Sequence, residues 1–163
     1  MHKRLLVSVL GYPNSGKSET WTNLFGSRQR TSTRERWLQL RGNTWIKVFL
    51  VNGSFEETGN SPDDVIPNDL PAIVLCSVQY HPNAMNTFNW FLEKEYEVFT
   101  QWINPSYRAR TNYTDELNII SQLQAANRTS IAQRIGNSSN LNSRVNEVRN
   151  FLSGWVDGAG LVF

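Results

Sequence analysis

The order of patterned segments along the chain predicts an α/β fold, a three-layer sandwich in which helices cover both faces of a mostly parallel central sheet. Three observations predict it. Strand-like apolar runs alternate with helix-like amphipathic runs. The run from residue 72 to 78 is apolar enough to be buried on both faces, as strands of parallel sheets are. Two early β-prone runs are separated by a short turn containing Gly42, which adds an early β-hairpin.

The first half of the chain predicts a strand, a helix and the hairpin. The apolar run from Leu5 to Leu10 is the first strand, and a helix of about Lys17 to Phe25 follows, since Gly26 is a good C-terminal cap. Residues 27–36 contain four arginines and have no apolar period, so we expect an exposed loop. The two hairpin strands are expected at Trp37–Leu40 and Trp45–Val51.

The second half begins with residues 52–71, which are rich in Gly, Pro and acidic residues and predict a long loop. A buried strand at 72–78, a helix opened by Pro82 and a strand at 96–103 come next. We expect a helical C-terminal part at 113–156 and a loose tail at 157–163. The length of 163 residues suits a single domain spanning 1–163.

Composition limits the classes of partner. The formal net charge of +2 is too small to indicate nucleic acid or a membrane surface as an obligatory partner. The six Trp are scattered without interleaved basic residues, except Trp37 beside Arg36, which favours core packing over nucleic-acid binding. No apolar run approaches the roughly 18 residues needed to cross a bilayer. We therefore expect a cytoplasmic protein without nucleic acid as a direct ligand.

One motif carries most of the functional information. Residues 11–18, Gly-Tyr-Pro-Asn-Ser-Gly-Lys-Ser, fit the pattern G-x-x-x-x-G-K-[ST], directly after a predicted strand and before a predicted helix. Glycines let successive backbone amides turn towards a phosphate, and the helix adds its positive end. Lys17 supplies a cation for the outer phosphates, and the Ser18 hydroxyl is placed to reach Mg²⁺.

On these residues the chain resembles the P-loop NTPase superfamily. The stretch GYPNSGKSETWTNLFG, residues 11–26, looks particularly similar to the start of small GTPase-type domains. The resemblance implies a P-loop NTPase-like domain that binds ATP or GTP with Mg²⁺, hydrolyses it slowly and works as a switch or motor component with a protein partner. The implied nucleotide-binding residues are Gly11, Pro13, Asn14, Ser15, Gly16, Lys17, Ser18 and Glu19.

The later parts of the predicted site are degenerate. A GTPase-like arrangement needs a metal-holding carboxylate after the strand 45–51, where this chain has Asn52, so Ser18 and Asn52 are the candidate metal residues. Glu56 and Glu57 follow closely and, with Lys17, are the candidate catalytic residues; either glutamate would aim a water or reach the metal through one. Asp63 and Asp64 rank below them.

The remaining expectations leave the nucleotide and the reaction open. In the arginine-rich loop of residues 27–36, here called the basic loop, Thr31 or Thr33 is a candidate for the Mg²⁺ shell. No Asn-Lys pair exists to read guanine, so ATP and GTP both stay open. One alternative is a small P-loop kinase that transfers the γ-phosphate to a small acceptor under an arginine-rich lid. Another is a nucleotide-binding assembly subunit without hydrolysis. Candidate lid arginines are Arg108, Arg110, Arg128 and Arg134.

Overall fold

The computed structural model describes residues 3–13, 15–103, 114–136 and 138–160. One sheet contains strands β1 (Arg4–Gly11), β2 (Arg36–Gln39), β3 (Trp45–Val51), β4 (Ile73–Gln79), β5 (Tyr96–Ile103) and β6 (Thr129–Arg134). Their order is β2-β3-β4-β1-β5-β6. The β2–β3 pair is antiparallel and the other four pairs are parallel. The predicted α/β fold, with a mostly parallel sheet and an early hairpin, is thus confirmed.

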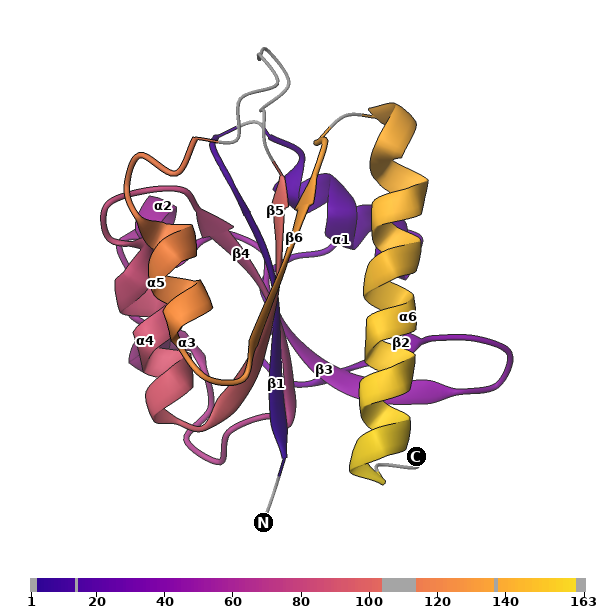
Figure 1. Ribbon diagram of the computed structural model, residues 1–163. Coiled ribbons are helices and arrows are strands. Elements are labelled where there is room, and N and C mark those ends of the chain that lie inside the picture. Colours follow the sequence, from indigo (N-terminus) through magenta and orange to yellow (C-terminus); the bar gives the residue numbers. More distant parts are fainter. Residues whose placement is uncertain (1–2, 14, 104–113, 137, 161–163) are drawn as a thin grey trace.

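Helices cover both faces of this sheet (Figure 1). The helical elements are α1 (Lys17–Phe25), α2 (Phe55–Thr58), α3 (Pro62–Val65), α4 (Ala84–Glu93), α5 (Ile119–Ala125), the 3-10 turn η1 (Ser138–Asn140) and α6 (Leu141–Ala159). Helices α1 and α6 lie on one face, and α4 and α5 lie on the other with the short α2 and α3. The long α6, last in the chain, lies beside α1, which brings the C-terminal region next to the first helix.

The strand β1 contributes to two hydrophobic cores because its side chains alternate between the two faces of the sheet. Leu6 and Leu10 belong to the core under α4 and α5, whereas Leu5, Val7 and Val9 belong to the core under α1 and α6. All five side chains are fully buried. The loop that follows this strand is therefore anchored in an element that is buried at every position after Arg4.

Three expectations about the elements need correction. The segment 113–156, expected to be helical, contains β6, a half-buried edge strand whose sequence Thr-Ser-Ile-Ala-Gln-Arg lacks a continuous apolar run. The helix α6 continues to Ala159, so residues 157–159 are not a loose tail. The long loop 52–71 carries two single-turn helices, each capped by a serine, Ser54 and Ser61.

The strand order separates β3 from β1. Strand β1, which leads into the motif residues, has β4 and β5 as its neighbours, and β4 lies between β1 and β3. The residue level with Gly11 on the neighbouring strand is therefore Gln79 of β4, and Asn52 at the end of β3 lies one strand further away.

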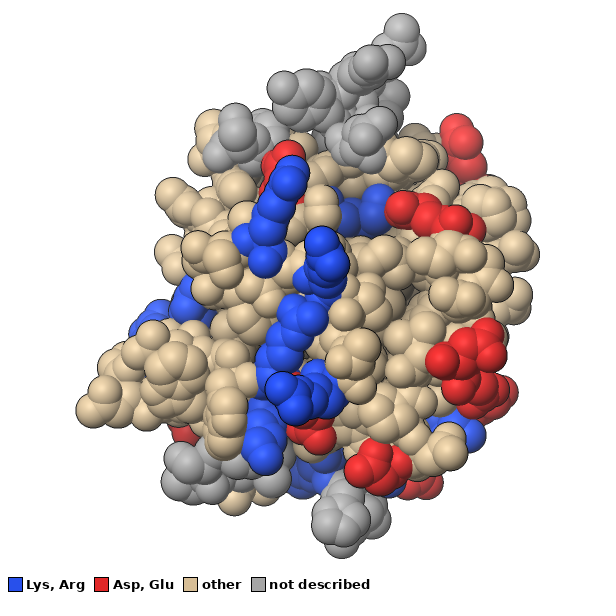
Figure 2. Space-filling view, turned by 180° about the vertical axis from the view of Figure 1, so that it is seen from behind, with Lys and Arg blue, Asp and Glu red and all other residues tan. Residues whose placement is uncertain are grey.

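Charge is distributed unevenly over the surface. Figure 2 shows the molecule from behind, towards the β2 edge of the sheet, where Lys and Arg side chains form a column down the middle and acidic side chains lie mainly to one side. In the described part of the chain, no helix is long and apolar enough to cross a membrane.

Candidate functional site: the loop between β1 and α1

The motif residues form a tight turn between the end of β1 and the start of α1. Gly16 precedes the helix with φ of 98°, a left-handed conformation that favours glycine. A Cβ atom added to Gly11 would lie 2.4 Å from the Ser15 Oγ and 2.9 Å from Cγ1 of Ile103. Both motif glycines are thus required by the local structure. Asn14, between them, lies outside the described residues.

This turn borders a cavity of about 430 Å³. Its lining residues are Pro13, Ser15, Gly16, Lys17, Ser18, Glu19, Asn52 and Glu57. The structure therefore brings most predicted site residues together, although Asn52 and Glu57 are far from the motif in sequence. Gly11 is not a lining residue and forms the buried end of β1 behind the turn.

The Lys17 side chain lies across the turn. Its Nζ donates hydrogen bonds to the carbonyl oxygens of Gly11, at 3.2 Å, and Tyr12, at 2.9 Å. The Glu57 carboxylate lies 3.7 Å from the same Nζ. Burial lowers the pKa of Lys17, and the neighbouring Glu57 partly opposes that shift. An anion in the cavity would compete with the two carbonyl groups for this ammonium.

Two buried side-chain oxygen atoms, each on a residue that lines the cavity, have no hydrogen-bond partner among the described residues. They are the Ser15 Oγ and the Asn52 Oδ1. Asn52 is held in place by its other amide atom, since its Nδ2 donates to the Gln29 carbonyl at 2.9 Å. Buried polar atoms are normally paired, so a bound polar group or water is the expected partner of both oxygens.

The basic loop supports Asn52 through Thr31. The Thr31 hydroxyl accepts hydrogen bonds from the backbone amide groups of Asn52, at 3.0 Å, and Gly53, at 3.4 Å. Its oxygen is thus directed at the end of β3, and Thr31 does not line the cavity. Thr33, the other candidate for a metal shell, is an exposed residue outside the lining.

The structure does not bring Glu56 into the cavity. One carboxylate oxygen accepts from the Gln79 backbone N–H at 2.8 Å, and the other accepts from the Thr87 hydroxyl at 2.6 Å. Glu56 therefore joins α2 to β4 and α4. Burial raises its pKa, although these two hydrogen bonds favour the charged form. Asp63 and Asp64 also lie outside the lining; Asp63 accepts from Trp90 and Asp64 caps α3.

A buried arginine lies behind the turn and was not predicted. Arg144 of α6 is 1% exposed, and its Nη1 donates to the Thr20 hydroxyl at 2.9 Å and to the Gln101 Oε1 at 3.0 Å. Burial lowers the pKa of Arg144 to about 10, which keeps it charged at neutral pH. Its Nη2 lies 3.7 Å from the position of a Cβ on Gly16, so a fixed positive charge stands close behind the motif.

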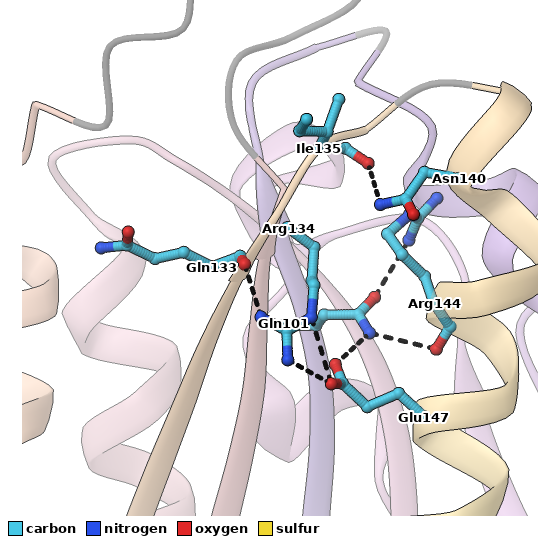
Figure 3. Close-up of polar contacts among 7 residues, drawn as sticks. All are labelled: Gln101, Gln133, Arg134, Ile135, Asn140, Arg144 and Glu147. Atoms are coloured by element: carbon cyan, nitrogen blue, oxygen red, sulfur yellow. Dashed lines mark hydrogen bonds and ion pairs between the residues drawn. The ribbon is translucent and has the colours of Figure 1, made fainter.

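Figure 3 shows the network that holds Arg144. The Gln101 Nε2 donates to the Arg144 carbonyl and to the Glu147 carboxylate, at 3.1 and 2.9 Å. Glu147 in turn pairs with the Arg134 guanidinium of β6. Arg134 is therefore engaged in joining β6 to α6, which counts against a role in a mobile kinase lid. Arg108 and Arg110 lie outside the described residues, and Arg128 is exposed.

A second unpredicted residue, Gly136, follows β6. A Cβ atom at Gly136 would lie 2.6 Å from the Ser15 carbonyl oxygen and 3.2 Å from the Ile103 Cβ. The β6–α6 connection therefore packs directly against the turn between β1 and α1. In the sequence, Gly136 resembles an ordinary helix breaker, and only the three-dimensional contact reveals its role.

Within the described residues, no three His, Cys, Asp or Glu side chains form a cluster able to hold a metal ion. Ser18, Asn52 and Glu57, whose side chains carry hydroxyl, amide and carboxylate oxygens, do line the cavity. This oxygen set resembles the environment of Mg²⁺, which keeps several waters and is held largely by substrate phosphates. No family model matches this chain, and no curated protein matches it. Its function must be inferred from the cavity and the residues around it.

Proposed function

We propose that the chain is a P-loop NTPase-like domain that binds a nucleoside triphosphate with Mg²⁺ and hydrolyses it slowly. The observation that carries the proposal is the turn between β1 and α1, in which Gly11 has no room for a Cβ atom, Gly16 has a positive φ and Lys17 is directed across the turn. Gly16 offers no side chain to cap α1, so the first amides of this helix remain available to an anion. The unpartnered oxygens of Ser15 and Asn52 indicate a polar ligand in the same cavity.

Charge in the cavity favours a metal-bound nucleotide. Among its described lining residues, Lys17 is positive and Glu19 and Glu57 are negative. A bare triphosphate would approach two carboxylates, and this repulsion is reduced when a divalent cation accompanies the phosphates. Ser18 and Asn52 would hold Mg²⁺, directly or through water, and the bound metal would neutralise part of the phosphate charge. Binding is therefore expected to require Mg²⁺.

The residues around the cavity favour slow turnover. Asn52 provides a neutral amide where a carboxylate would bind a hard cation more strongly. Glu56 is held by Gln79 and Thr87, which leaves Glu57 as the carboxylate of the candidate pair that can orient a water. Slow hydrolysis suits a switch or motor component whose rate is set by a protein partner.

The first test is a thermal-shift panel of ATP, GTP, CTP and UTP at millimolar concentration, with and without Mg²⁺. Ligand at about 100 times its Kd stabilises the native state by about 2.7 kcal/mol, which raises Tm measurably. We expect this rise for wild type with Mg²⁺ and at least one nucleotide, and its loss in Lys17→Ala. Lys94→Ala is the matched control, because it removes the same charge from an exposed residue near Arg4, at the start of β1, whereas the cavity lies beyond the end of this strand.

Phosphate release at high protein concentration separates the hydrolase from the assembly-subunit alternative. Slow release by wild type and none by Lys17→Ala would support hydrolysis. Nucleotide-dependent stabilisation with no release would support the non-hydrolysing subunit. If release needed an added acceptor molecule, the kinase alternative would replace the hydrolase. A panel with no thermal shift for any nucleotide would refute the whole proposal.

A further inference from the structure

A second surface, separate from the cavity, has properties that nucleotide binding does not use. It lies along the open β2 edge of the sheet and contains exposed Arg28, Arg30, Arg34 and Lys47 with exposed Trp37 and Trp45. We call these six residues the edge surface. In Figure 2 this edge faces the viewer, and Lys and Arg side chains form a column along it. One carboxylate, Glu35, lies in the same segment of the chain.

The path of the chain explains why these cations follow the edge. Ser32 pairs with Leu50, donating its N–H to the Leu50 carbonyl at 2.7 Å and accepting from the Leu50 N–H through its hydroxyl. The segment before β2 thus contacts β3 again beyond the hairpin ladder, towards the cavity. Arg30 and Arg34 lie on either side of this contact. Positive charge therefore extends along most of the length of β3.

The hairpin register places two indole rings and a cation on one face. Trp37 pairs with Lys47, and Gln39 pairs with Trp45. The two Trp are consequently diagonal neighbours on one face, a relation in which residues lie roughly 7–8 Å apart. The Lys47 Nζ lies 5.1 Å from the centre of the Trp37 ring. The alternate residues, Leu38 and Ile46, point into the core, so the Trp face is turned outwards.

Exposure of these rings needs an explanation. Trp37 is 52% exposed and Trp45 is 43% exposed, whereas Trp21 and Trp102 are buried. Large exposed aromatic side chains beside cations are what a single-stranded nucleic acid requires: bases stack on the rings and phosphates contact the basic side chains. An acidic peptide would use the charges but would leave the flat indole faces without a matching planar group.

We propose that the edge surface binds single-stranded nucleic acid, although the sequence alone predicted core packing for the Trp residues and no nucleic acid as a direct ligand; the exposure of Trp37 and Trp45 is the reason for the change. The surface also connects to the cavity, because the same loop holds Asn52 through the Gln29 carbonyl and the Thr31 hydroxyl. A strand bound to Arg30 would therefore contact the segment that positions a cavity residue. Binding itself does not depend on nucleotide hydrolysis, so the two proposals fail or survive separately.

The test is fluorescence anisotropy of a fluorescein-labelled 20-nucleotide oligothymidylate, titrated with the wild-type chain at several salt concentrations. Each neutralised phosphate of a single strand contributes a slope of about −0.7 in log K against log salt, so four cations predict a slope near −3. Trp37→Ala and Trp45→Ala should each weaken binding about 10-fold through lost stacking. Arg30→Gln with Arg34→Gln should reduce the magnitude of the slope by about 1.4.

The chain supplies a matched control. Lys94 lies 5.5 Å from the centre of the Trp90 ring on α4, a second Lys–Trp pair away from the edge surface. Lys94→Gln should leave both affinity and slope unchanged. Tm values of all variants show whether they fold, and the exposed positions of the changes make unfolding unexpected. Binding of polyglutamate of similar length is measured in parallel, to distinguish an acidic protein partner from single-stranded nucleic acid.

Three outcomes would overturn the inference. No change in anisotropy at low salt would exclude the interaction. Equal weakening by Lys94→Gln and by the arginine changes would mean that overall charge alone attracts the oligonucleotide. Tight polyglutamate binding that is unaffected by Trp37→Ala would assign the surface to an acidic protein instead.

Discussion

At the scale of single residues, the turn between β1 and α1 is held by glycines that lie close to Ser15. Gly11 lies against Ser15 from one side, and Gly136 lies against the Ser15 carbonyl from another. Ser15 itself is only 1% exposed. The loop thus takes its shape from contacts among Gly11, Ser15 and Gly136. Gly11 and Ser15 belong to the motif, whereas Gly136 lies in a distant segment of the chain.

Gly136→Ala should disturb this arrangement. The added methyl group would meet backbone 2.6 Å away, and such overpacking costs about 1–3 kcal/mol. We expect a lower urea midpoint and a smaller nucleotide-induced Tm rise than in wild type. Gly154→Ala is the control, because it lies within α6 with nothing within 4 Å and should stabilise the helix by about 0.5–1 kcal/mol. Equal effects at the two glycines would contradict the contact with the loop.

Glu56 gives a pH-dependent prediction. Burial raises its pKa above the ordinary value of 4.5, so the folded protein holds this proton more tightly than the unfolded chain does. Its contribution to stability is greatest below 4.5 and is lost as pH rises through the raised folded value. Glu56→Gln keeps an acceptor for the Gln79 N–H and offers an amide to Thr87 without a charge.

The stability of Glu56→Gln relative to wild type should therefore increase as pH rises from about 4 to 7. Tm measured across this range for both proteins checks the effect. Glu93→Gln, which changes an exposed glutamate, is the matched control. A pH-independent difference between Glu56→Gln and wild type would mean that burial does not govern this carboxyl group.

At the scale of elements, α6 connects the loop to the β6 edge. It presents Arg144 to Thr20 of α1 and Gln101 of β5, and Glu147 to Arg134 of β6. Buried ion and amide networks are costly when one member is removed, because the partners keep their desolvation cost. This helix therefore fixes the position of α1 relative to the sheet through polar contacts as well as apolar ones.

Arg144→Met should destabilise the fold by about 1–3 kcal/mol, because the Gln101 Oε1 loses its donor inside the protein. The double change Arg144→Met with Gln101→Met should cost less than the sum of the two single changes. Urea unfolding of the four proteins in this cycle gives the coupling energy. Additive single effects would show that the two side chains do not depend on each other.

At the scale of the whole molecule, one sheet separates two cores, and elements from both ends of the chain build the face covered by α1 and α6. The core under α1 and α6 joins Leu5 and Val7 of the first strand to Val148 and Leu152 of the last helix. Such contacts between distant segments make the turn between β1 and α1 dependent on the C-terminal helix for its support.

Leu152→Ala tests this dependence. Its side chain is fully buried, and truncation of a buried leucine costs about 2–5 kcal/mol. The exposed Asn146→Ala on the same helix should change stability by less than about 0.5 kcal/mol. Urea midpoints of both variants provide the comparison. Similar small effects would mean that α6 is not an integral part of the fold.

The sequence by itself determined the class of fold, the hairpin, the glycine-lysine loop and the strand and helix around it. These features depend on local patterns: apolar runs, turn residues and the spacing of Gly11, Gly16 and Lys17. It did not reveal β6, since an edge strand that is half covered needs no strong apolar pattern.

Only the tertiary structure decided which distant residues meet. Strand order placed Asn52 and Glu57 in the cavity, helix packing placed Arg144 behind the loop, and hairpin register placed Lys47 beside Trp37. The separation of Glu57 from Glu56, adjacent in sequence, follows from the direction in which α2 turns each side chain. Contacts of this kind depend on geometry between segments, which no local pattern encodes.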